Sequence, residues 1–218
     1  MKKRFYAIAL APMLFVACNT ADSPAPAQQA TQKAKTEVKS VENRVQEVAT
    51  TSNNIKYVSK PMVIERGMSH IKGFIGTLQP TLKGALQQDK THEIAMGTCS
   101  SIAMQMTDDY NKVSSEGKVR RTALKYRNPA NKPDAIDKEV MYRLQAVNDG
   151  KPVAVDMGNK YRVYKPLQMK KPCLLCHGDM NKMTPQVQNM IKTKYPHDLA
   201  TGFKLGEFRG VVVAEIPK

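Results

Sequence analysis

Two cysteines and a histidine, all reactive or metal-binding residue types, lie close together in this 218-residue chain. Their sequence is Cys173-Leu174-Leu175-Cys176-His177. Thiols bind metals and form disulfides, and imidazole is a common metal ligand. The C-x-x-C-H spacing is therefore compatible with a zinc site, with a redox-active dithiol, or with covalent attachment of haem. The choice depends on the compartment of the protein and on the residues around the motif.

The N-terminus indicates export. Lys2, Lys3 and Arg4 precede an uncharged, mostly apolar run, Phe5–Ala17. A membrane-spanning helix needs about 20 apolar residues, whereas a shorter apolar run behind positive charges is typical of a cleaved secretory signal. We therefore expect residues 1–17 to be a signal peptide.

The end of this signal resembles the lipobox of bacterial lipoproteins, in which a cysteine is lipidated and becomes the mature N-terminus. The pattern here is Leu14-Phe15-Val16-Ala17-Cys18. We expect Cys18 to carry the lipid and to anchor the protein in the periplasm. Asn19 favours the outer membrane, because an Asp at this position would retain a lipoprotein at the inner membrane. The alternative is an ordinary cleaved signal followed by an incidental cysteine.

Export narrows the chemistry of the C-x-x-C-H motif. A zinc site would need a second ligand pair at similar spacing, and Cys99 and His197 are isolated. A thioredoxin-type dithiol would open a helix within a βαβ unit, whereas this motif follows a predicted strand. Attachment of haem, which takes place outside the bacterial cytoplasm, fits better. We predict that Cys173 and Cys176 bind the vinyl groups of one haem c, with His177 as the proximal iron ligand.

One cysteine then lacks a role. The chain has four cysteines, at positions 18, 99, 173 and 176. Free thiols are unusual in an oxidising compartment. If Cys18 carries lipid and the motif uses its own two thiols, Cys99 is left over and needs a function of its own.

The chain divides into a signal, a tether and one domain. Residues 18–56 are expected to form a flexible tether, because residues 19–36 are rich in Ala, Gln, Thr and Pro and cannot bury a core. A short helix is expected within the tether, where valines recur at helical spacing (Val38, Val41, Val45, Val48). Residues 57–218, about 160 residues, suffice for a single domain with its own core.

Helical spacing of apolar residues predicts three helices in this domain. In the first, Ser59 is a candidate cap, and Pro80 is expected to break or kink the helix. The apolar stripe of this helix is Ile64, Met68, Ile71, Ile75, Leu78, Leu82 and Leu86. The third helix is predicted to begin near Pro133, after a turn in which Asn131 is a candidate cap, and to stop at Asn148-Asp149-Gly150. Its inward residues are expected to be Ile136, Val140, Leu144 and Val147.

The second predicted helix runs from Thr91 to about Asn111 and contains the unassigned cysteine. Its apolar stripe is Ala95, Cys99, Ile102 and Met106. Cys99 is thus expected on a face that covers something buried.

Runs rich in β-branched residues predict strands at 119–126, 153–157, 161–169 and 207–216. Helices come first along the chain and strands come mostly later. This order indicates an α+β fold with an antiparallel sheet.

The chain is strongly basic. Its net charge is +15, and about +11 of this belongs to residues 57–218. Such a surface attracts anions, but an exported protein rarely meets nucleic acid, so lipid headgroups, an acidic partner protein or haem propionates are better candidates. Arg120, Arg121 and Arg127 could pair with the propionates. A solvated basic surface without a partner is the alternative.

Several stretches resemble, in order, a bacterial family of extracytoplasmic c-type haem domains. They are VRRTALKYRNPANKPD (119–134), YKPL (164–167), CLLCHGD (173–179), YPHDLATG (195–202) and LGEFRG (205–210). The family was long described as a domain of unknown function, and its members are often fused to histidine kinases. The resemblance covers about residues 60–218. It implies a PAS-like antiparallel sheet with flanking N-terminal helices and a single c-type haem.

The resemblance also implies the second axial ligand of the iron. In this family a cysteine on an early helix can fill that place, and the matching position is Cys99 in MGTCSSIAMQM. The leftover thiol and its apolar stripe agree with this role. His92, seven residues earlier on the same predicted helix, is an alternative ligand, and a buried structural role for Cys99 is another.

Two classes of haem function follow. The first is a redox or gas sensor or an electron-transfer module, and the second is a small enzyme of the peroxidase type, which needs an open sixth position and a distal acid–base group. A haem-free lipoprotein with structural disulfide chemistry is a third class. We expect the first class. Because no kinase follows the haem motif in this sequence, sensing would require a separate signalling or redox partner.

Overall fold

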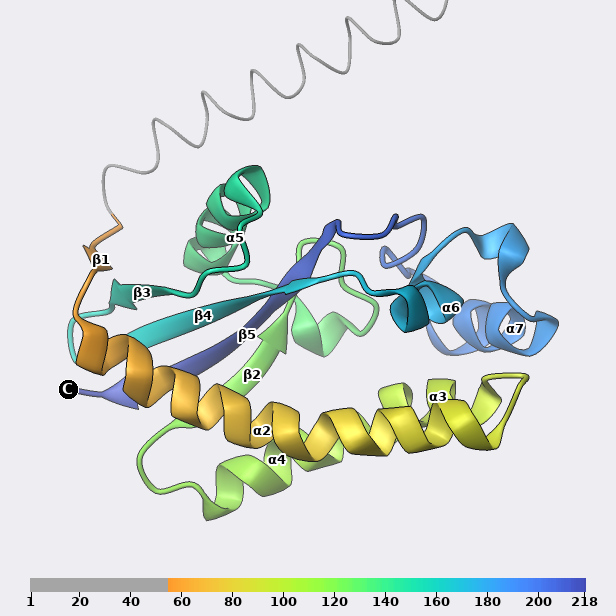
Figure 1. Cartoon of the computed structure of the whole chain (residues 1–218), viewed down its shortest axis with the longest axis horizontal. Helices are drawn as coiled ribbons and strands as arrows, with labels where there is room; N and C mark the ends of the chain where they lie inside the picture. The colour runs from red at the N-terminus through yellow and green to blue at the C-terminus, as the bar shows by residue number, and fades with distance from the viewer. Residues whose placement is uncertain (1–54) are drawn as a thin grey trace, which may run out of the picture. The chain divides into compact units, whose positions relative to one another are not determined.

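The computed structural model describes residues 55–218. The predicted signal peptide, the lipidation site Cys18 and most of the tether lie outside the described residues. The described part is an α+β domain, as predicted, built around one antiparallel sheet (Figure 1).

The sheet has five strands in the order β1-β3-β4-β5-β2, and every neighbouring pair is antiparallel. The strands are β1 (Tyr57–Val58), β2 (Lys118–Thr122), β3 (Val153–Asp156), β4 (Lys160–Gln168) and β5 (Phe208–Pro217). Four of these were predicted, although β2 ends four residues earlier than expected. The sequence pattern missed β1, because two residues are too few to show an alternation.

The helical elements are more numerous than predicted. They are α2 (Pro61–Gln88), α3 (Glu93–Gly97), the π-helical turn η2 (Thr98–Ile102), α4 (Ala103–Val113), α5 (Ala135–Val147), α6 (Leu174–His177) and α7 (Pro185–Lys194), with the 3₁₀ turns η3 (Pro129–Asn131), η4 (Lys171–Cys173) and η5 (Met180–Lys182). Among the described residues, no helix combines the length and the apolar character that crossing a bilayer requires.

Helix α2 corrects the predicted cap and excludes a break at Pro80. Its N-cap is Lys60 and not Ser59, and Pro61 at the first helical position supplies the preset φ angle of a helix start. The helix also continues through Pro80 to Gln88. Buried residues on both sides of the proline, Phe74 and Ala85, hold the two halves in one helix despite the missing N–H.

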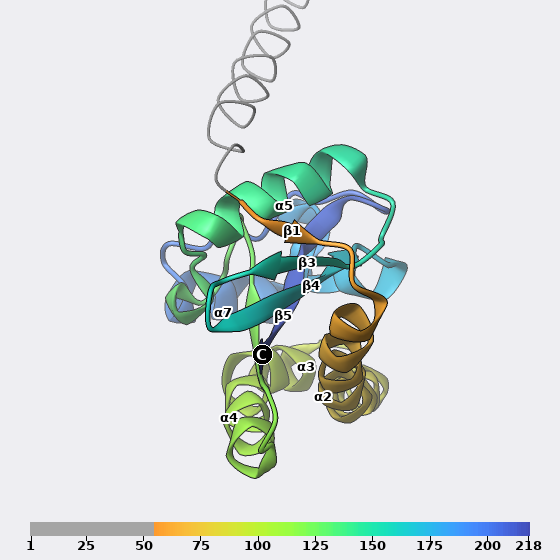
Figure 2. The same cartoon turned by 90° about the vertical axis from the view of Figure 1, so that its left-hand side faces the viewer.

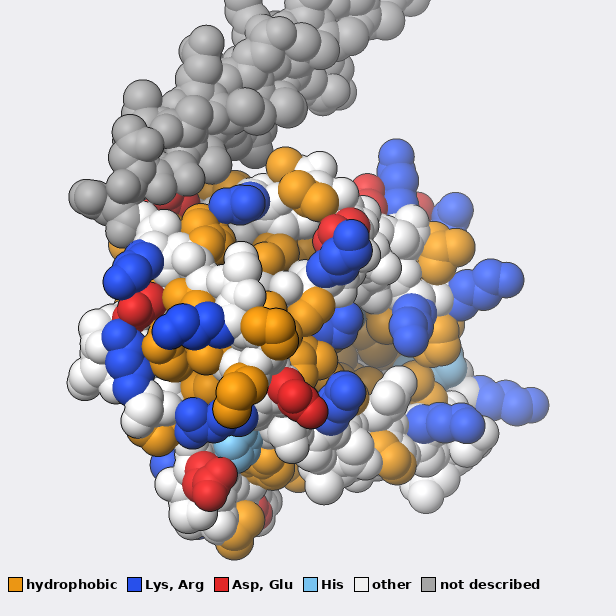
Figure 3. Space-filling view, turned by 60° about the vertical axis from the view of Figure 1, so that its left-hand side comes forward, with side chains coloured by type: hydrophobic (Ala, Val, Ile, Leu, Met, Phe, Trp, Pro, Cys, Tyr) orange, Lys and Arg blue, Asp and Glu red, His pale blue; other side chains and the backbone are white. Residues whose placement is uncertain are grey.

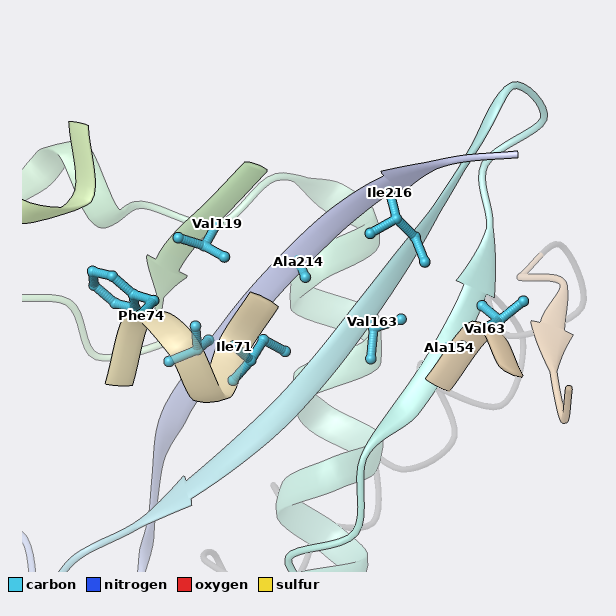
Figure 4. Packing of buried hydrophobic residues seen from close by; sticks show 9 residues of the cluster. Val63, Ile71, Phe74, Val119, Ala154, Val163, Ala214 and Ile216 are labelled. Carbon is cyan, nitrogen blue, oxygen red and sulfur yellow. The ribbon is translucent and has the colours of Figure 1, made fainter. Parts of the chain in front are cut away.

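Helices cover both faces of the sheet, as Figure 2 shows with α5 on one side and α2 and α4 on the other. On the α2 side the core is formed by Val63, Ile71, Phe74, Val119, Ala154, Val163, Val212, Ala214 and Ile216 (Figure 4). On the α5 side it is formed by Val140, Met141, Leu144, Val155, Tyr164, Phe208, Val211 and Val213. Successive residues of β5 thus alternate between the two cores.

Helix α5 begins and packs differently from the prediction. Asp134 is its N-cap and forms a capping box with Asp137, so Asn131 is not the cap of this helix. Val147, which was expected to face inward, is exposed, and Met141 is buried instead. The predicted stop is confirmed, since Asn148 has the left-handed conformation that ends a helix, with φ = 47°.

Between β4 and β5 the chain leaves the sheet and forms an inserted lobe, residues 169–207, which contains α6 and α7 (Figure 1). Met96 of α3 packs against the lobe residues Met183, Val187 and Ile191. The C-x-x-C-H motif is therefore brought next to the helical segment that contains Cys99.

Candidate functional site

Cys99 lies in η2, within a helical segment that is continuous from Glu93 to Val113. The π turn places an extra residue in the helix, and such turns are frequent at functional sites. It also rotates the residues that follow relative to the predicted stripe. Ile102, expected to face inward, is 43% exposed, and Ala103 is buried in its place.

A cavity of about 250 Å³ lies where β2, β4 and β5 meet α2, η2 and α6. The structure brings five predicted site residues to its wall: Cys99, Arg121, Arg127, Cys176 and His177. Cys99 and His177 are far apart in sequence, so the fold alone places them at one site. Cys173 is not among the lining residues and packs instead against the cluster of Met169, Ala200 and Phe203.

His177 is prepared to bind a metal through one nitrogen. Its Nδ1–H donates a hydrogen bond to the carbonyl oxygen of Ala200, at 2.7 Å. Burial, together with the positive charges of Arg209 and Arg127, holds the pKa of His177 well below its ordinary value. The ring is therefore neutral at neutral pH, and its Nε2 lone pair is available to a metal.

The backbone fixes the position of this ring. The N–H of Phe203 donates to the carbonyl of His177 at 3.0 Å, and the N–H of Gly202 donates to that of Gly178 at 2.7 Å. A Cβ at position 178 would lie 2.6 Å from the carbonyl oxygen of Leu174. Glycine is therefore required directly after the histidine.

The three described cysteines are all free thiols. Burial raises the pKa of Cys176 to about 11. Burial also raises the pKa of Cys99, although the nearby guanidinium groups of Arg121, Arg127 and Arg209 oppose this. Without a metal, both thiols are protonated at neutral pH, and a bound metal would deprotonate Cys99.

Arg127 uses most of its donors within the chain. Its guanidinium pairs with buried Asp198 at 3.0 Å and donates to the carbonyl of Cys176 at 2.7 Å and to that of Ala200 at 3.3 Å. Arg127 thus joins the C-x-x-C-H turn to the segment that accepts from His177. This leaves it little capacity for the predicted propionate. Arg120 also points elsewhere, because it pairs with Asp137 on the α5 side of the sheet.

Arg121 and Arg209 line the same cavity and form no ion pair with any residue between 55 and 218. The Nε of Arg121 is buried without a hydrogen-bond partner in this part of the chain, and one Nη donates to Met104 Sδ at 3.5 Å. Burial lowers the pKa of both side chains, to about 10 for Arg209. Two half-buried cations without counter-ions among the described residues indicate a ligand that carries negative charge.

Sequence reasoning missed Arg209. Its only signal was its place in the LGEFRG stretch, directly before Gly210 at the start of β5. The packing of β5 against β2 brings Arg209 to the cavity, and no local pattern contains that information.

His92, the alternative metal ligand, is not among the residues that line the cavity. It caps α3 in a left-handed conformation, with φ = 62°. His197 is exposed on a loop, and His70 packs near Tyr110. The described residues include all four histidines of the chain, and only His177 reaches the cavity.

This donor set suits a particular kind of ligand. Within residues 55–218, no three Cys, His, Asp or Glu side chains converge to hold a bare metal ion. The cavity instead offers thiols, one imidazole, two unpaired cations and apolar walls. These groups fit an apolar, anionic ligand that brings its own metal.

Comparison with known proteins places the chain in a family. The model of the Tll0287-like family matches residues 25–217. Among solved structures, the chain is similar to one described as the cyanobacterial heme-protein Tll0287, with a TM-score of 0.57 and 21% identity over 69% of this chain and 94% of that one. The comparison with curated proteins gave no match. At this identity the solved structure supports the fold, and the family match covers most of the sequence. The chain belongs to the Tll0287-like family.

Proposed function

We propose that Cys173 and Cys176 hold one haem c through thioether bonds, that His177 is the proximal iron ligand and that Cys99 is the distal one. The protein would then act as a redox or gas sensor or as an electron-transfer module. The observation that carries this proposal is the shared cavity, whose wall contains both Cys99 and His177. The solved relative, described as a heme-protein, supports it.

When bound, haem would supply one-electron redox chemistry at its iron. The chain's own residues orient and tune the site. The carbonyl of Ala200 accepts from His177 Nδ1, which fixes the ring tautomer and makes Nε2 a better donor. Arg121 and Arg209 are the residues best placed to pair with the propionates, because their guanidinium groups lack counter-ions and Arg127 is already engaged.

The cavity wall favours a sensor or an electron-transfer module over a peroxidase. A peroxidase of the expected type needs a distal histidine, and His177, already assigned as the proximal ligand, is the only histidine on the described wall. Cys99 would occupy the distal position instead. Thiolate donation favours ferric iron, so we expect a low reduction potential and a distal bond that weakens on reduction.

The cellular setting is also a proposal. The apolar run that ends in Val16-Ala17-Cys18 supports a periplasmic protein anchored by lipid, with the outer membrane favoured by Asn19. The antiparallel sheet with helices on both faces supports the PAS-like architecture. A separate redox or signalling protein would receive the output.

The test is expression of the full chain in a host with a cytochrome c maturation system. We expect haem staining to survive denaturing electrophoresis and the mass to increase by that of one haem. Replacing both motif cysteines (Cys173→Ser with Cys176→Ser) should abolish covalent attachment. Release of all the haem from the wild type under denaturing conditions would overturn the proposal.

A further inference from the structure

The loop of residues 198–206 lies directly against the C-x-x-C-H turn. Ala200 accepts the hydrogen bond from the His177 ring at 2.7 Å, and Phe203 donates from its backbone to the His177 carbonyl at 3.0 Å. The ring of Phe203 also stands edge-on to that of His177, with centroids 6.4 Å apart. The inner side of this loop therefore touches the proposed iron ligand at three points.

The outer side of the same loop exposes apolar side chains. Leu199 is 47% exposed and Leu205 is 57% exposed, while Ala200 and Phe203 between them are buried. Leu175, within the C-x-x-C-H motif itself, is 38% exposed. A single exposed leucine needs no explanation, but three on the turn and on the loop that covers it form a candidate contact area.

Exposed lysines neighbour these leucines in the chain. Lys170 and Lys171 directly precede the motif, and Lys204 lies in the loop; all three are exposed. Backbone hydrogen bonds of 2.9 Å join Met169 to Glu207 and Gly206 to Met169, so the two segments lie side by side.

Lys125 extends the positive rim from the neighbouring segment, where its Nζ donates to the carbonyl of Thr201 at 2.9 Å. The exposed acidic residues in these segments are Asp179 and Glu207. These segments therefore expose apolar side chains together with an excess of positive charge. Such a surface fits an acidic protein partner, which complementary charge would steer into place.

We propose that Leu175, Leu199, Leu205, Lys170, Lys171 and Lys204 form a docking surface for an acidic one-electron carrier protein. This inference rests on the proposed haem. In the step, the reduced carrier loses one electron and the ferric iron gains it to become ferrous, while no covalent bond forms or breaks. A carrier that touches Leu199 is separated from the His177 ring by one peptide unit and one hydrogen bond, so this loop offers a short route to the iron.

The test uses the haem-loaded full chain and reduced flavodoxin, an acidic carrier, as the probe in stopped-flow measurements. The docking variant combines Lys170→Glu, Lys171→Glu and Lys204→Glu. The control variant makes the same change of charge at Lys60, Lys72 and Lys138, which are exposed and belong to the α2 and α5 region. At low salt we expect the docking variant to lose about tenfold or more in the bimolecular rate, and the control to lose clearly less.

Two further measurements separate the possible outcomes. The double variant Leu199→Ala with Leu205→Ala should also lower the rate of haem reduction by flavodoxin, without changing the salt dependence of that rate. Reduction by dithionite should stay the same in all variants, which would show that the haem site is intact. Equal losses in the docking and control variants, or a wild-type rate that does not fall with added salt, would overturn the docking surface. Absence of a haem spectrum in the wild type would instead overturn the proposed function.

Discussion

Cys99 lines the cavity and lies within a five-residue π turn of its helix. The sequence predicted the helix, the buried side of Cys99 and its meeting with the C-x-x-C-H motif. It did not predict the turn, because apolar spacing is read against a regular 3.6-residue period. The misplacement of Ile102 was the direct result of that assumption.

Replacing Cys99 tests its assignment as distal ligand. In Cys99→Ala we expect the ferric spectrum to change from low-spin to high-spin or to a new ligand set, because the thiolate is lost. Electron paramagnetic resonance would measure the change. His92→Ala is the matched control and should leave the spectrum as it is, since His92 is outside the cavity wall. The reverse pattern would give the role to the histidine.

The arginines that line the cavity should differ in their effects: one should affect mainly stability, and two should affect mainly the reduction potential. Arg127→Gln leaves the buried carboxylate of Asp198 without its partner, so we expect a loss of about 3–5 kcal/mol in the free energy of unfolding. Arg121→Gln and Arg209→Gln break no ion pair within residues 55–218 and should cost much less. They should instead lower the reduction potential, because removal of positive charge near the iron favours the ferric state.

Urea denaturation and redox titration of the haem-loaded protein would measure these effects. Equal losses in the free energy of unfolding in all three variants would contradict the expected difference between Arg127 and the other two arginines. An unchanged reduction potential in both Arg121→Gln and Arg209→Gln would show that neither side chain acts on the haem.

At the scale of elements, α2 lies unusually close to the sheet at Gly67. A Cβ at this position would lie 2.3 Å from Val163 Cγ2 of β4. We therefore expect Gly67→Ala to lower the free energy of unfolding, although alanine favours helices. Gly84→Ala on the same helix is the control, because nothing lies within 4 Å of its added Cβ.

Gly84→Ala should raise the free energy of unfolding by up to about 1 kcal/mol. Thermal or urea unfolding would give both values. If Gly67→Ala were as stable as Gly84→Ala, α2 would not be held at this distance from the sheet.

Helix α5 is joined through charged groups to the face of the sheet that it covers, opposite α2. Asp137 is fully buried, accepts from Arg120 at 2.7 and 2.8 Å, and accepts from the hydroxyl of Tyr164 at 3.0 Å. Arg162 pairs with Asp134 at 2.6 Å and with Glu215 at 2.9 Å. The sequence predicted α5 from its apolar residues, but this network depends on strand register and could not be predicted.

This network predicts sensitivity to acid. Burial alone would raise the pKa of Asp134 and that of Glu215, but hydrogen bonds and Arg162 lower both below their ordinary values. A carboxyl group with a lowered folded-state pKa stabilises the protein above its unfolded-state pKa, and this contribution is lost as the pH falls through the folded value. We therefore expect the free energy of unfolding to fall below about pH 4.

In Arg162→Met the free energy of unfolding at pH 7 should be lower by about 1.5–3 kcal/mol and should depend less on acid, because Asp134 and Glu215 lose a partner but are only partly buried. Urea denaturation between pH 7 and pH 3 would measure both curves. A wild-type curve that stays flat down to pH 3 would show that the network does not contribute in this way.

At the scale of the whole molecule, positive charge is spread widely. Lys and Arg side chains outnumber acidic ones on the face drawn in Figure 3. The proposed docking surface is therefore distinguished by its place on the loop whose Ala200 and Phe203 contact His177, and not by charge alone. The sequence predicted the excess of positive charge and places Lys170 and Lys171 before the C-x-x-C-H motif, but only the fold adds Lys125 and Lys204 to its surroundings.

We expect the N-terminus to set the location of the molecule, through the proposed lipid anchor at Cys18. Cys18→Ser should release the protein into the soluble periplasmic fraction, because the lipid anchor would be lost. Cell fractionation with an antibody against the domain would measure this, and the haem spectrum should be the same in both forms. A wild-type protein found in the soluble fraction and beginning at a residue other than Cys18 would contradict the lipobox interpretation.

The inserted lobe has one further consequence, for the order of assembly. Its two ends are tied at Met169 and Glu207 by backbone hydrogen bonds, where β4 and β5 already pair. The sheet closes the chain there, so β4 and β5 can pair before the lobe has packed against the rest of the domain. We expect the maturation machinery to reach the motif in a domain whose sheet has already formed. The attached cofactor would then fasten the lobe to the helix that contains Cys99, as the last step of folding.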